Sequence, residues 1–332
     1  MTSHVSIAVS EASQPVEVRM AVRRAAASLG FSEEDAQRAA IVGTELATNL
    51  VKHTTGSGEI LVRARTSECE IEILSLDRGP GMADVGVSMS DGHSTSGSPG
   101  TGLGAVRRLA DVFDLYSSPG QGTVVMARVR SGRARLARAP LEAAGVSVPR
   151  AGESVCGDGW MVRPHDRGPI TAIADGLGHG PEAGVAAHAA LHTLTTSSFA
   201  TLVEALALIH DALRPTRGAA LSLLQIDRHA GVVRFAGLGN VGAAVCQNGS
   251  TRQAVSLNGT LGHEARTFRE FTYPWTPGAF FVMFSDGLIS HWSLAAYPGL
   301  TTHDPAVIAA VLYRDFSRGR DDVTVVVGRE AA

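Results

Sequence analysis

Aspartates stand at the ends of several predicted strands of the chain, most of them beside a glycine. Asp158 precedes the strand "GWMVRP", Asp175 follows "ITAIA", Asp286 follows "FFVMFS", and the pair Asp321 and Asp322 precedes "VTVVV". One Asp-Gly at a strand end is usually a turn, but four such positions beside core strands favour a common role. Carboxylate and carbonyl oxygens are the ligands of hard divalent cations, so this pattern predicts a metal site.

The stretch "ITAIADGLGHGPEAG", residues 170–184, could instead be a glycine loop that wraps a phosphate. A phosphate-cradling loop of that kind carries Lys-Ser or Lys-Thr after its glycines, and this stretch has neither. The metal interpretation is therefore favoured. His179 in the same loop could donate a proton to a leaving oxygen, but a role behind the metal ligands or at the surface is the favoured interpretation.

Two polar residues stand four apart on a predicted helix of the first half of the chain. Glu45 and Asn49 share one face of that helix because residues at i and i+4 are neighbours. They lie beside an apolar stripe formed by Ile41, Val42, Leu46 and Leu50. Taken alone, such a pair could belong to the surface.

Two glycine motifs follow Glu45 and Asn49 along the chain. "DRGPGM" places Asp77, Gly79 and Gly81 after a predicted strand, and "GTGLGAVRRL" opens a predicted helix from Gly104 to about residue 112. Glycines at a helix N-terminus let backbone N–H groups approach an anion, which the helix dipole also favours. Each motif alone is weak evidence for a nucleotide site.

In this order the three motifs resemble the N box and the two glycine boxes of the GHKL ATPases, and most closely the RsbT-type anti-sigma-factor serine kinases. The resemblance covers residues 5–130. It implies that Asn49 ligates Mg²⁺, that Asp77 accepts a hydrogen bond from the adenine amino group, and that Glu45 orients or deprotonates the attacking seryl hydroxyl. The implied ATP-binding residues are Asn49, Asp77, Gly79, Gly81, Gly100, Gly102 and Gly104, with Glu45 catalytic.

The second half, over residues 143–328, resembles the PPM family of metal-dependent serine/threonine phosphatases, in particular its SpoIIE-like group and the RsbX branch. The resemblance implies two Mn²⁺ or Mg²⁺ ions, which clamp a phosphate and activate water. Asp175 would bridge the ions. The implied metal ligands are Asp158, Asp175, the Gly176 carbonyl, Asp286 and Asp321, with Asp322 a neighbour. No arginine that grips the phosphate is identifiable from the sequence.

The predicted elements fit an α+β protein of two domains. The first half contains a strand, two helices and further strands, which predict a GHKL-type α/β sandwich with helices on one face of a mixed sheet. In its first helix Val16, Met20, Val22 and Ala26 can share a face, and Ser32 caps the second. The second half contains strands around a helix pair, with a short helix at residues 305–316, and predicts a PPM-type αββα sandwich.

The composition bounds the classes of function. The chain has 332 residues, 44% of them hydrophobic, and a net charge of -3, which favours neither nucleic acid nor membrane as partner. Three scattered cysteines and the absence of a signal-peptide pattern predict a cytoplasmic protein. The expected domains are residues 1–130 and 143–332, joined by an arginine-rich linker over residues 131–142. Without interleaved aromatics, that linker is not expected to bind nucleic acid.

These features predict a bifunctional regulator of bacterial partner switching. The first domain would be an ATP-dependent serine/threonine kinase and the second a metal-dependent phosphatase, both acting on STAS-domain anti-sigma-factor antagonists. A sigma factor or another switch protein is a further expected partner. The alternative is a phosphatase whose first domain binds ATP only as a sensor or as a binding module for a partner.

Overall fold

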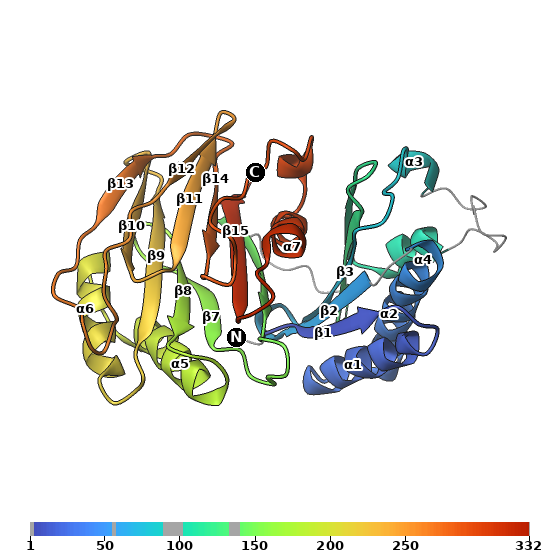
Figure 1. Cartoon of the computed structure of the whole chain (residues 1–332), viewed down its shortest axis with the longest axis horizontal. Coiled ribbons are helices and arrows are strands. Elements are labelled where there is room, and N and C mark those ends of the chain that lie inside the picture. The colour runs from blue at the N-terminus through green and yellow to red at the C-terminus, as the bar shows by residue number, and fades with distance from the viewer. Residues whose placement is uncertain (1–2, 55–57, 89–101, 133–139, 332) are drawn as a thin grey trace. The chain divides into compact units, whose positions relative to one another are not determined.

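The computed structural model describes residues 3–54, 58–88, 102–132 and 140–331 (Figure 1). The chain divides into two compact units. The N-terminal unit comprises residues 2–137 together with residues 293–314, and the C-terminal unit comprises residues 138–292 together with residues 315–332. The domain boundaries predicted at residues 130 and 143 stay a prediction. The structure adds that residues 293–314, from the second half of the chain, belong to the N-terminal unit.

The N-terminal unit contains one five-stranded sheet in the order β1-β2-β3-β5-β4. Its strands are β1 (Val5–Val9), β2 (Gly58–Arg65), β3 (Glu70–Asp77), β4 (Val112–Ser117) and β5 (Thr123–Arg130). Every pairing between them is antiparallel, so the prediction of a mixed sheet is wrong. Short turns join β2 to β3 and β4 to β5, which is the connection that antiparallel neighbours allow.

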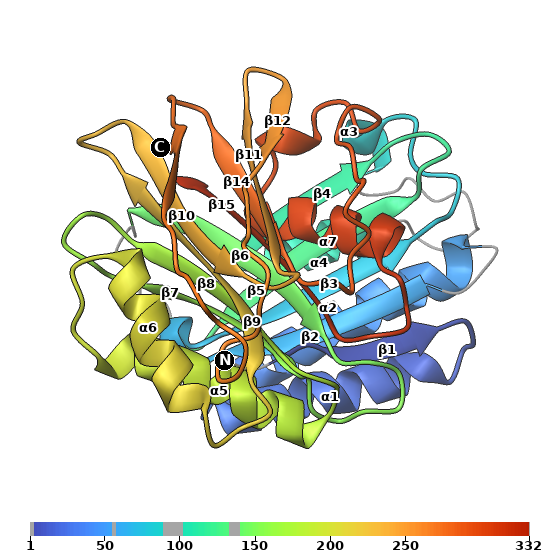
Figure 2. The same ribbon diagram turned by 60° about the vertical axis from the view of Figure 1, so that its left-hand side comes forward.

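Helices cover one face of this sheet (Figures 1 and 2). They are α1 (Gln14–Ser28), α2 (Glu33–His53) and α4 (Gly102–Leu109), with the short α3 (Val85–Ser88) and the 3₁₀ turn η1 (Thr66–Glu68) between strands. Helix α4 begins and ends earlier than expected. The helix ends early because the Asp111 amide donates to the Arg128 carbonyl of the sheet at 2.8 Å. From this residue the chain continues into strand β4.

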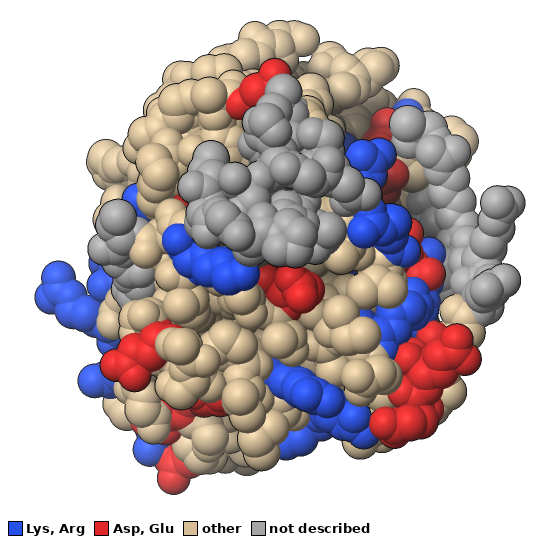
Figure 3. Space-filling view, turned by 90° about the vertical axis from the view of Figure 1, so that its right-hand side faces the viewer, with Lys and Arg blue, Asp and Glu red and all other residues tan. Residues whose placement is uncertain are grey.

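Charged side chains position α2 against its neighbours. Arg38 donates to the Leu109 carbonyl at the end of α4 and to the Arg130 carbonyl at the end of β5, each at 2.9 Å. Its guanidinium also pairs with Asp35 and Asp111 at 2.9 Å. One side chain therefore holds α2, α4 and the sheet together. Elsewhere on the face that Figure 3 presents, basic and acidic side chains are interspersed.

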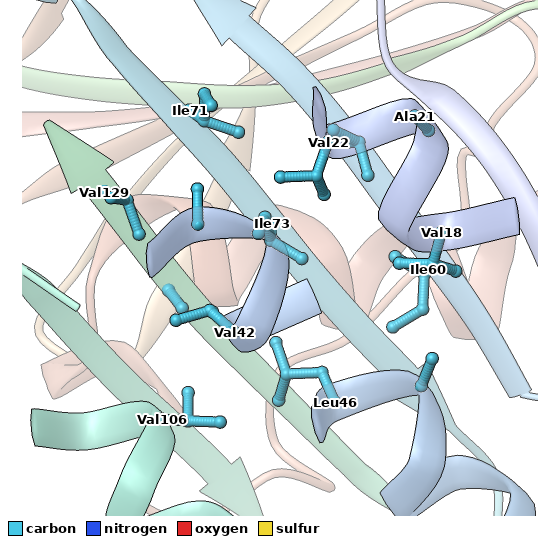
Figure 4. Close-up of a cluster of buried hydrophobic side chains, with 14 of the residues drawn as sticks. Val18, Ala21, Val22, Val42, Leu46, Ile60, Ile71, Ile73, Val106 and Val129 are labelled. Carbon is cyan, nitrogen blue, oxygen red and sulfur yellow. The ribbon is translucent and has the colours of Figure 1, made fainter. Parts of the chain in front are cut away.

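The core of the N-terminal unit lies between α1, α2 and the sheet (Figure 4). In α1 the buried residues are Val18, Ala21, Val22 and Ala26. Val16 and Met20, expected on that face, are 62% and 57% exposed. The stripe that starts at Val18 and repeats every three to four residues is the one that meets β2 and β3.

A buried acid contacts three basic side chains, two of them on the neighbouring strands β2 and β5. Glu72 of β3 is fully buried and accepts hydrogen bonds from Arg63 at 2.6 Å and from Arg128 at 2.7 Å, with His4 at 3.4 Å. Burial raises the pKa of Glu72, but the charges of Arg63 and Arg128 outweigh it and hold the pKa well below its ordinary value. The carboxylate therefore stays ionised in the folded protein at neutral pH.

Glu72→Gln is expected to lower the free energy of unfolding by about 3–5 kcal/mol, because it leaves buried cations without their partner. Because the folded-state pKa is depressed, the stabilisation is present above the unfolded pKa of 4.5 and is lost as the pH falls through the folded one. Thermal unfolding at pH 7 and at acid pH measures both. Glu68→Gln, which removes a partly exposed partner of Arg65, is the control and should shift the melting temperature little. Equal melting temperatures of wild type and Glu72→Gln would contradict the assignment.

Residues 293–314 belong to the N-terminal unit through several polar contacts. The segment holds the 3₁₀ turn η2 (Leu300–Thr302) and most of α7 (Pro305–Phe316), which matches the helix expected there. Arg128 donates two hydrogen bonds to the Asp304 carboxylate, at 2.9 and 3.1 Å. Arg314 donates to the backbone carbonyl of Asp77 at 3.0 Å. The segment thus reaches the end of β3.

The C-terminal unit contains two five-stranded antiparallel sheets, ordered β13-β10-β9-β8-β7 and β12-β11-β14-β15-β6. The first sheet consists of β7 (Asp158–Arg163), β8 (Ile170–Gly176), β9 (Ala219–Asp227), β10 (Val232–Leu238) and β13 (Phe271–Pro274). The second consists of β6 (Leu141–Val148), β11 (Gly242–Gln247), β12 (Ser250–Gln253), β14 (Phe280–Phe284) and β15 (Val323–Glu330).

Two apolar layers hold the C-terminal unit together. Side chains from both sheets, including Trp160, Phe235 and Phe281, form the core between them. Helices α5 (Pro181–Thr196) and α6 (Leu202–Leu213) pack on the outer face of the first sheet and form the second layer (Figure 2). These two helices are the pair that the sequence predicts among the strands of this half. Two sheets in contact, with helices outside, place the strand ends of both sheets at common edges.

Candidate active sites

The first candidate site is built where α2 passes the first turn of α4. Ser32 caps α2, since its hydroxyl accepts the Asp35 amide at 3.1 Å. A methyl group at Gly102 would lie 3.0 Å from Asn49 Oδ1 and 3.5 Å from Glu45 Oε2. The structure therefore brings Glu45, Asn49 and Gly102 together, as the sequence predicted. A side chain at position 102 would crowd these polar atoms at the N-terminus of α4, and glycine avoids this.

The side-chain amide of Asn49 has a free hydrogen-bonding position that a ligand could fill. Its Nδ2 is buried and has no hydrogen-bond partner in the described part of the chain. A buried polar atom without a partner is costly, and a bound ligand would remove that cost. Of the apolar residues expected beside it, Leu46 and Leu50 are buried, whereas Ile41 is 38% exposed and lies outside the stripe.

Asp77 ends β3, and the backbone is tightly packed around it. Its Oδ1 accepts the Gly79 amide at 2.7 Å. A methyl group at Gly122 would meet the Asp77 carbonyl at 2.0 Å, and one at Gly81, where φ is +68°, would meet the Ser118 carbonyl at 2.0 Å. Burial raises the pKa of the Asp77 carboxyl, against the Gly79 hydrogen bond and the charge of Arg314.

The glycines of the second box lie partly outside the described residues. Gly102 and Gly104 are in the first turn of α4, and Gly104 is buried. Gly100 lies outside the described residues. The donors that this helix N-terminus could offer to ATP phosphates, and the Mg²⁺ that Asn49 would hold, remain a prediction from the motif.

The second candidate site is formed by strand ends of both sheets of the C-terminal unit. Asp158 and Asp175 are paired across β7 and β8. Asp286 follows β14 by two residues and Asp321 precedes β15 by two, and these strands are also neighbours. The structure thus gathers the predicted aspartates at one edge of the sandwich. Their pairing follows from strand order and register, which the sequence did not provide.

A cavity of about 330 Å³ opens at this edge. Asp175, Asp286 and Asp321 reach it from three strand ends. Its other lining residues are Leu177, Gly178, His179, Ala220, Gly239, Asn240, Gly259 and Thr260. His179 also pairs with Glu153, with 2.7 Å between Nδ1 and Oε1.

Buried carboxyls in this site repel one another. Desolvation raises the pKa of Asp175 far above its ordinary 3.8, and the charges of Asp158, Asp286 and Asp321 raise it further. Burial likewise raises the pKa of Asp158, and burial followed by the charge of Asp321 raises that of Asp286. Such a cluster is unfavourable unless protons or cations neutralise it.

The donor set fits hard divalent cations. It supplies the carboxylate oxygens of Asp175, Asp286 and Asp321 at the cavity, and Asp158 is paired with Asp175. Within that part of the chain no three His, Cys, Asp or Glu side chains already converge on one point. Ions that keep several waters and take few protein ligands each, as Mg²⁺ does, suit this arrangement better than a closed cage.

Gly176 lies where a side chain has no room. A methyl group there would meet the Ala183 carbonyl of α5 at 2.0 Å, and the Gly176 amide bonds the Gly157 carbonyl at 3.1 Å. Asp322 is not among the described residues that line the cavity, and its Oδ1 accepts the Arg150 amide at 2.9 Å. This is consistent with Asp321 as a ligand and Asp322 as its neighbour, and both roles stay predictions.

Two polar residues that support these carboxylates are not evident from the sequence. Asn240 donates to Asp286 Oδ2 at 2.6 Å, and Ser285 donates to Asp158 Oδ2 at 2.6 Å. Ser285 precedes Asp286 directly, and Asn240 follows a glycine turn, "GLGN". Neither has a spacing that marks it, since each acts on a residue far away in the chain.

Metal binding is expected to raise the melting temperature of the protein, and more at pH 8 than at pH 6. Because folding raises the pKa of Asp158 and Asp175, the metal-free fold loses stability as the pH rises above 3.8. Cations replace those protons, so protons compete with them at lower pH. Thermal unfolding with and without Mn²⁺ checks this, with Asp166→Asn in an exposed loop as the control that keeps the response. An equal response at both pH values would count against it.

Comparisons with known proteins give a family match for each half of the chain. Residues 8–128 match the model of the histidine kinase-like ATPase domain, and residues 165–329 match that of stage II sporulation protein E, SpoIIE. Serine/threonine-protein kinase RsbT of Bacillus subtilis (strain 168) is 39% identical over 114 residues, which are 34% of this chain and 85% of that protein. Phosphoserine phosphatase RsbX of the same organism is 28% identical over 141 residues, 42% of this chain and 70% of that one.

Two solved structures are similar to this chain over more than half of its length. A structure described as a bacterial stressosome, a modular system adapted to control secondary messenger signalling, has a TM-score of 0.53 at 29% identity and covers 57% of this chain and 99% of that one. RsbX in complex with magnesium has a TM-score of 0.51 at 20% identity over 59% of this chain and 98% of that one, which shows the fold. The described helices include none long and apolar enough to cross a membrane.

The chain belongs to the RsbT-type serine/threonine kinases of the histidine-kinase-like ATPase fold, joined in one polypeptide to a SpoIIE-type phosphatase domain of the PPM family. The predicted fold class, two α+β domains of these types, is confirmed. The protein is an enzyme whose two domains come from families of opposite activity, one for serine/threonine phosphorylation and one for dephosphorylation.

Proposed function

We propose that this protein is a bifunctional regulator of partner switching, which phosphorylates and dephosphorylates STAS-domain anti-sigma-factor antagonists. The observation that carries the proposal is the acidic cavity at which Asp175, Asp286 and Asp321 meet, in the same chain as the Glu45–Asn49–Gly102 cluster. The names of the two relatives, a serine/threonine kinase and a phosphoserine phosphatase, support serine as the modified residue.

In the phosphatase half, the chain's own residues position the carboxylates. Ser285 fixes Asp158 and Asn240 fixes Asp286, so both carboxylates present their remaining oxygens in set directions. Asp158, Asp175, Gly176, Asp286 and Asp321 would hold two Mn²⁺ or Mg²⁺ ions. Bound there, such ions would stabilise charge on the transferring phosphoryl group and activate water. The Glu153 carboxylate orients His179 at the cavity wall.

In the kinase half, Glu45 and Asn49 face the first turn of α4. ATP would supply the phosphoryl group, with Mg²⁺ held by Asn49 and the adenine bound by Asp77. Glu45 would orient the seryl hydroxyl of the protein substrate and accept its proton. Phosphoryl transfer depends mostly on such alignment and on charge stabilisation. We place the protein in the cytoplasm, where its three unpaired cysteines would stay reduced. A sigma factor or another switch protein is a further proposed partner.

Incubation of the full chain with labelled ATP and candidate STAS proteins, with and without Mn²⁺, tests the proposal. Label should appear on a STAS serine or threonine and disappear when Mn²⁺ is added. Label that never appears, although ATP binds and Mn²⁺-dependent phosphate release occurs, would support the alternative in which the first domain is a sensor or a binding module. Absence of any phosphate release with Mn²⁺ would exclude the phosphatase.

A further inference from the structure

The cavity of the phosphatase half contains no permanent cation in its described wall. Its charged lining residues are three aspartates, and His179 is the one basic group among the residues that line it. A phosphoserine side chain carries close to two negative charges at neutral pH. Bound metal ions would offset the charge at the aspartates. Among the described residues, the wall itself offers no permanently positive side chain to the outer oxygens of the phosphate, or to a substrate that approaches from solvent.

Arg217 lies beside this wall. Its Nη1 is 3.1 Å from the position that a side-chain carbon at Gly178 would occupy. Gly178 lines the cavity and has a φ of +91°. A side chain at Gly178 would crowd the guanidinium, so the glycine lets Arg217 lie against a residue that lines the cavity.

The backbone that carries Arg217 is held firmly at the cavity rim. The Leu177 amide bonds the Gly218 carbonyl at 3.0 Å, and Ala219 exchanges two hydrogen bonds with Leu261, at 3.1 and 2.9 Å. Gly218, at φ +81°, packs so closely on the Leu261 carbonyl that a methyl group would lie 2.5 Å from it. The position of the Arg217 backbone is thus fixed relative to two loops that line the cavity.

The guanidinium itself is free to exchange its partner. It forms an ion pair with Glu182 in the first turn of α5, and the two side chains are 51% and 69% exposed. Exposed pairs of this kind contribute little stability. A phosphate dianion accepts two parallel hydrogen bonds from a guanidinium and is a stronger partner than an exposed carboxylate.

We infer that Arg217 is a phosphate-binding residue of this site, which leaves Glu182 and binds the phosphate of the incoming phosphoserine. Glu182 holds the guanidinium at the rim when no substrate is bound and competes with the phosphate for it. Arg217 contributes to binding and positioning, while the aspartate cluster carries the chemistry. The inference rests on the proposed phosphatase function.

The test uses the full chain with Mn²⁺ and two readouts, calorimetric binding of inorganic phosphate and turnover of a phosphoserine peptide. Arg217→Ala should raise the dissociation constant of phosphate and the KM of the peptide about tenfold, with kcat within about twofold. Arg217→Lys should fall between this variant and wild type. Glu182→Gln should bind phosphate about two- to threefold more tightly, because it removes the competing carboxylate.

Arg214→Ala is the matched control. Arg214 lies three residues earlier and forms an exposed pair with Asp211 of α6, whereas Arg217 lies beside Gly178 of the cavity wall. It should leave phosphate affinity and KM unchanged. If the wild type is active but Arg217→Ala and Glu182→Gln both bind phosphate within twofold of its affinity, the inference is overturned. The proposed function would stand in that case. A wild type without Mn²⁺-dependent turnover would overturn the proposed function and the inference with it.

Discussion

Asp175→Asn is expected to reduce phosphatase turnover to background, a loss of about a thousandfold or more, equivalent to about 4 kcal/mol of transition-state stabilisation. Asp175 pairs with Asp158 across β7 and β8 and also reaches the cavity lined by Asp286 and Asp321. A bridging carboxylate would serve both ions, which lie roughly 3.5–4 Å apart in two-metal sites. Asparagine keeps the shape of the side chain and removes the charge between the two cations.

The other aspartates provide graded controls for this result. Asp286→Asn should weaken one ion only, so added Mn²⁺ should restore part of its turnover. Asp322→Asn should be milder than Asp321→Asn, because Asp321 lines the cavity whereas Asp322 bonds the Arg150 amide. Metal titrations of phosphoserine-peptide turnover measure all four variants. Near wild-type turnover of Asp175→Asn, or a wild type that stays active with chelator, would refute the two-metal account.

Asn49→Asp and Asn49→Ala are each expected to abolish binding of Mg·ATP without unfolding the chain. Asn49 is partly exposed at the edge of α2, and the stability of the unit comes from Val42, Leu46 and their neighbours. Calorimetry with Mg·ATP measures the loss, which should exceed about a hundredfold in affinity, equivalent to about 2.7 kcal/mol. Thermal unfolding should show a melting temperature close to that of wild type.

Thr48→Ala is the matched control for Asn49. Thr48 is the preceding residue of the same helix, and its hydroxyl bonds the Thr44 carbonyl within α2 at 2.7 Å. Its removal should leave ATP affinity within about twofold, because that hydroxyl serves the helix. If Asn49→Ala bound Mg·ATP as tightly as Thr48→Ala does, the nucleotide site would have been assigned to the wrong helix face.

Much of the fold follows from local patterns. The helices around residues 181–196 and 305–316 and the Ser32 cap are visible in the sequence because spacing and capping residues act within a few positions. Strands β6 and β12 are not evident from the sequence. Part of β6 lies in the stretch interpreted as linker, with small Ala and Gly residues in place of a clear alternation, and β12 is exposed and polar.

The arrangement of the candidate sites depends on contacts that the sequence does not reveal. Each aspartate could be found because it stands beside an apolar strand. That Asp158 opposes Asp175 is a matter of register, and that Asp286 lies beside Asn240 is a matter of sheet order. Both depend on contacts between distant parts of the chain. The buried face of α1 was misjudged for a related reason, because Val16 and Val18 are equally apolar and only packing against the sheet selects Val18.

One chain is expected to hold two opposing and separable activities. The most direct measurement compares Asp175→Asn and Asn49→Asp chains in one assay with labelled ATP, Mn²⁺ and a STAS protein. The account predicts that Asp175→Asn accumulates labelled, phosphorylated STAS protein. It predicts that Asn49→Asp transfers no label but removes phosphate from STAS protein that was phosphorylated beforehand. If either variant lost both activities, or if Asp175→Asn accumulated no phosphorylated protein, the account of two independent sites would be contradicted.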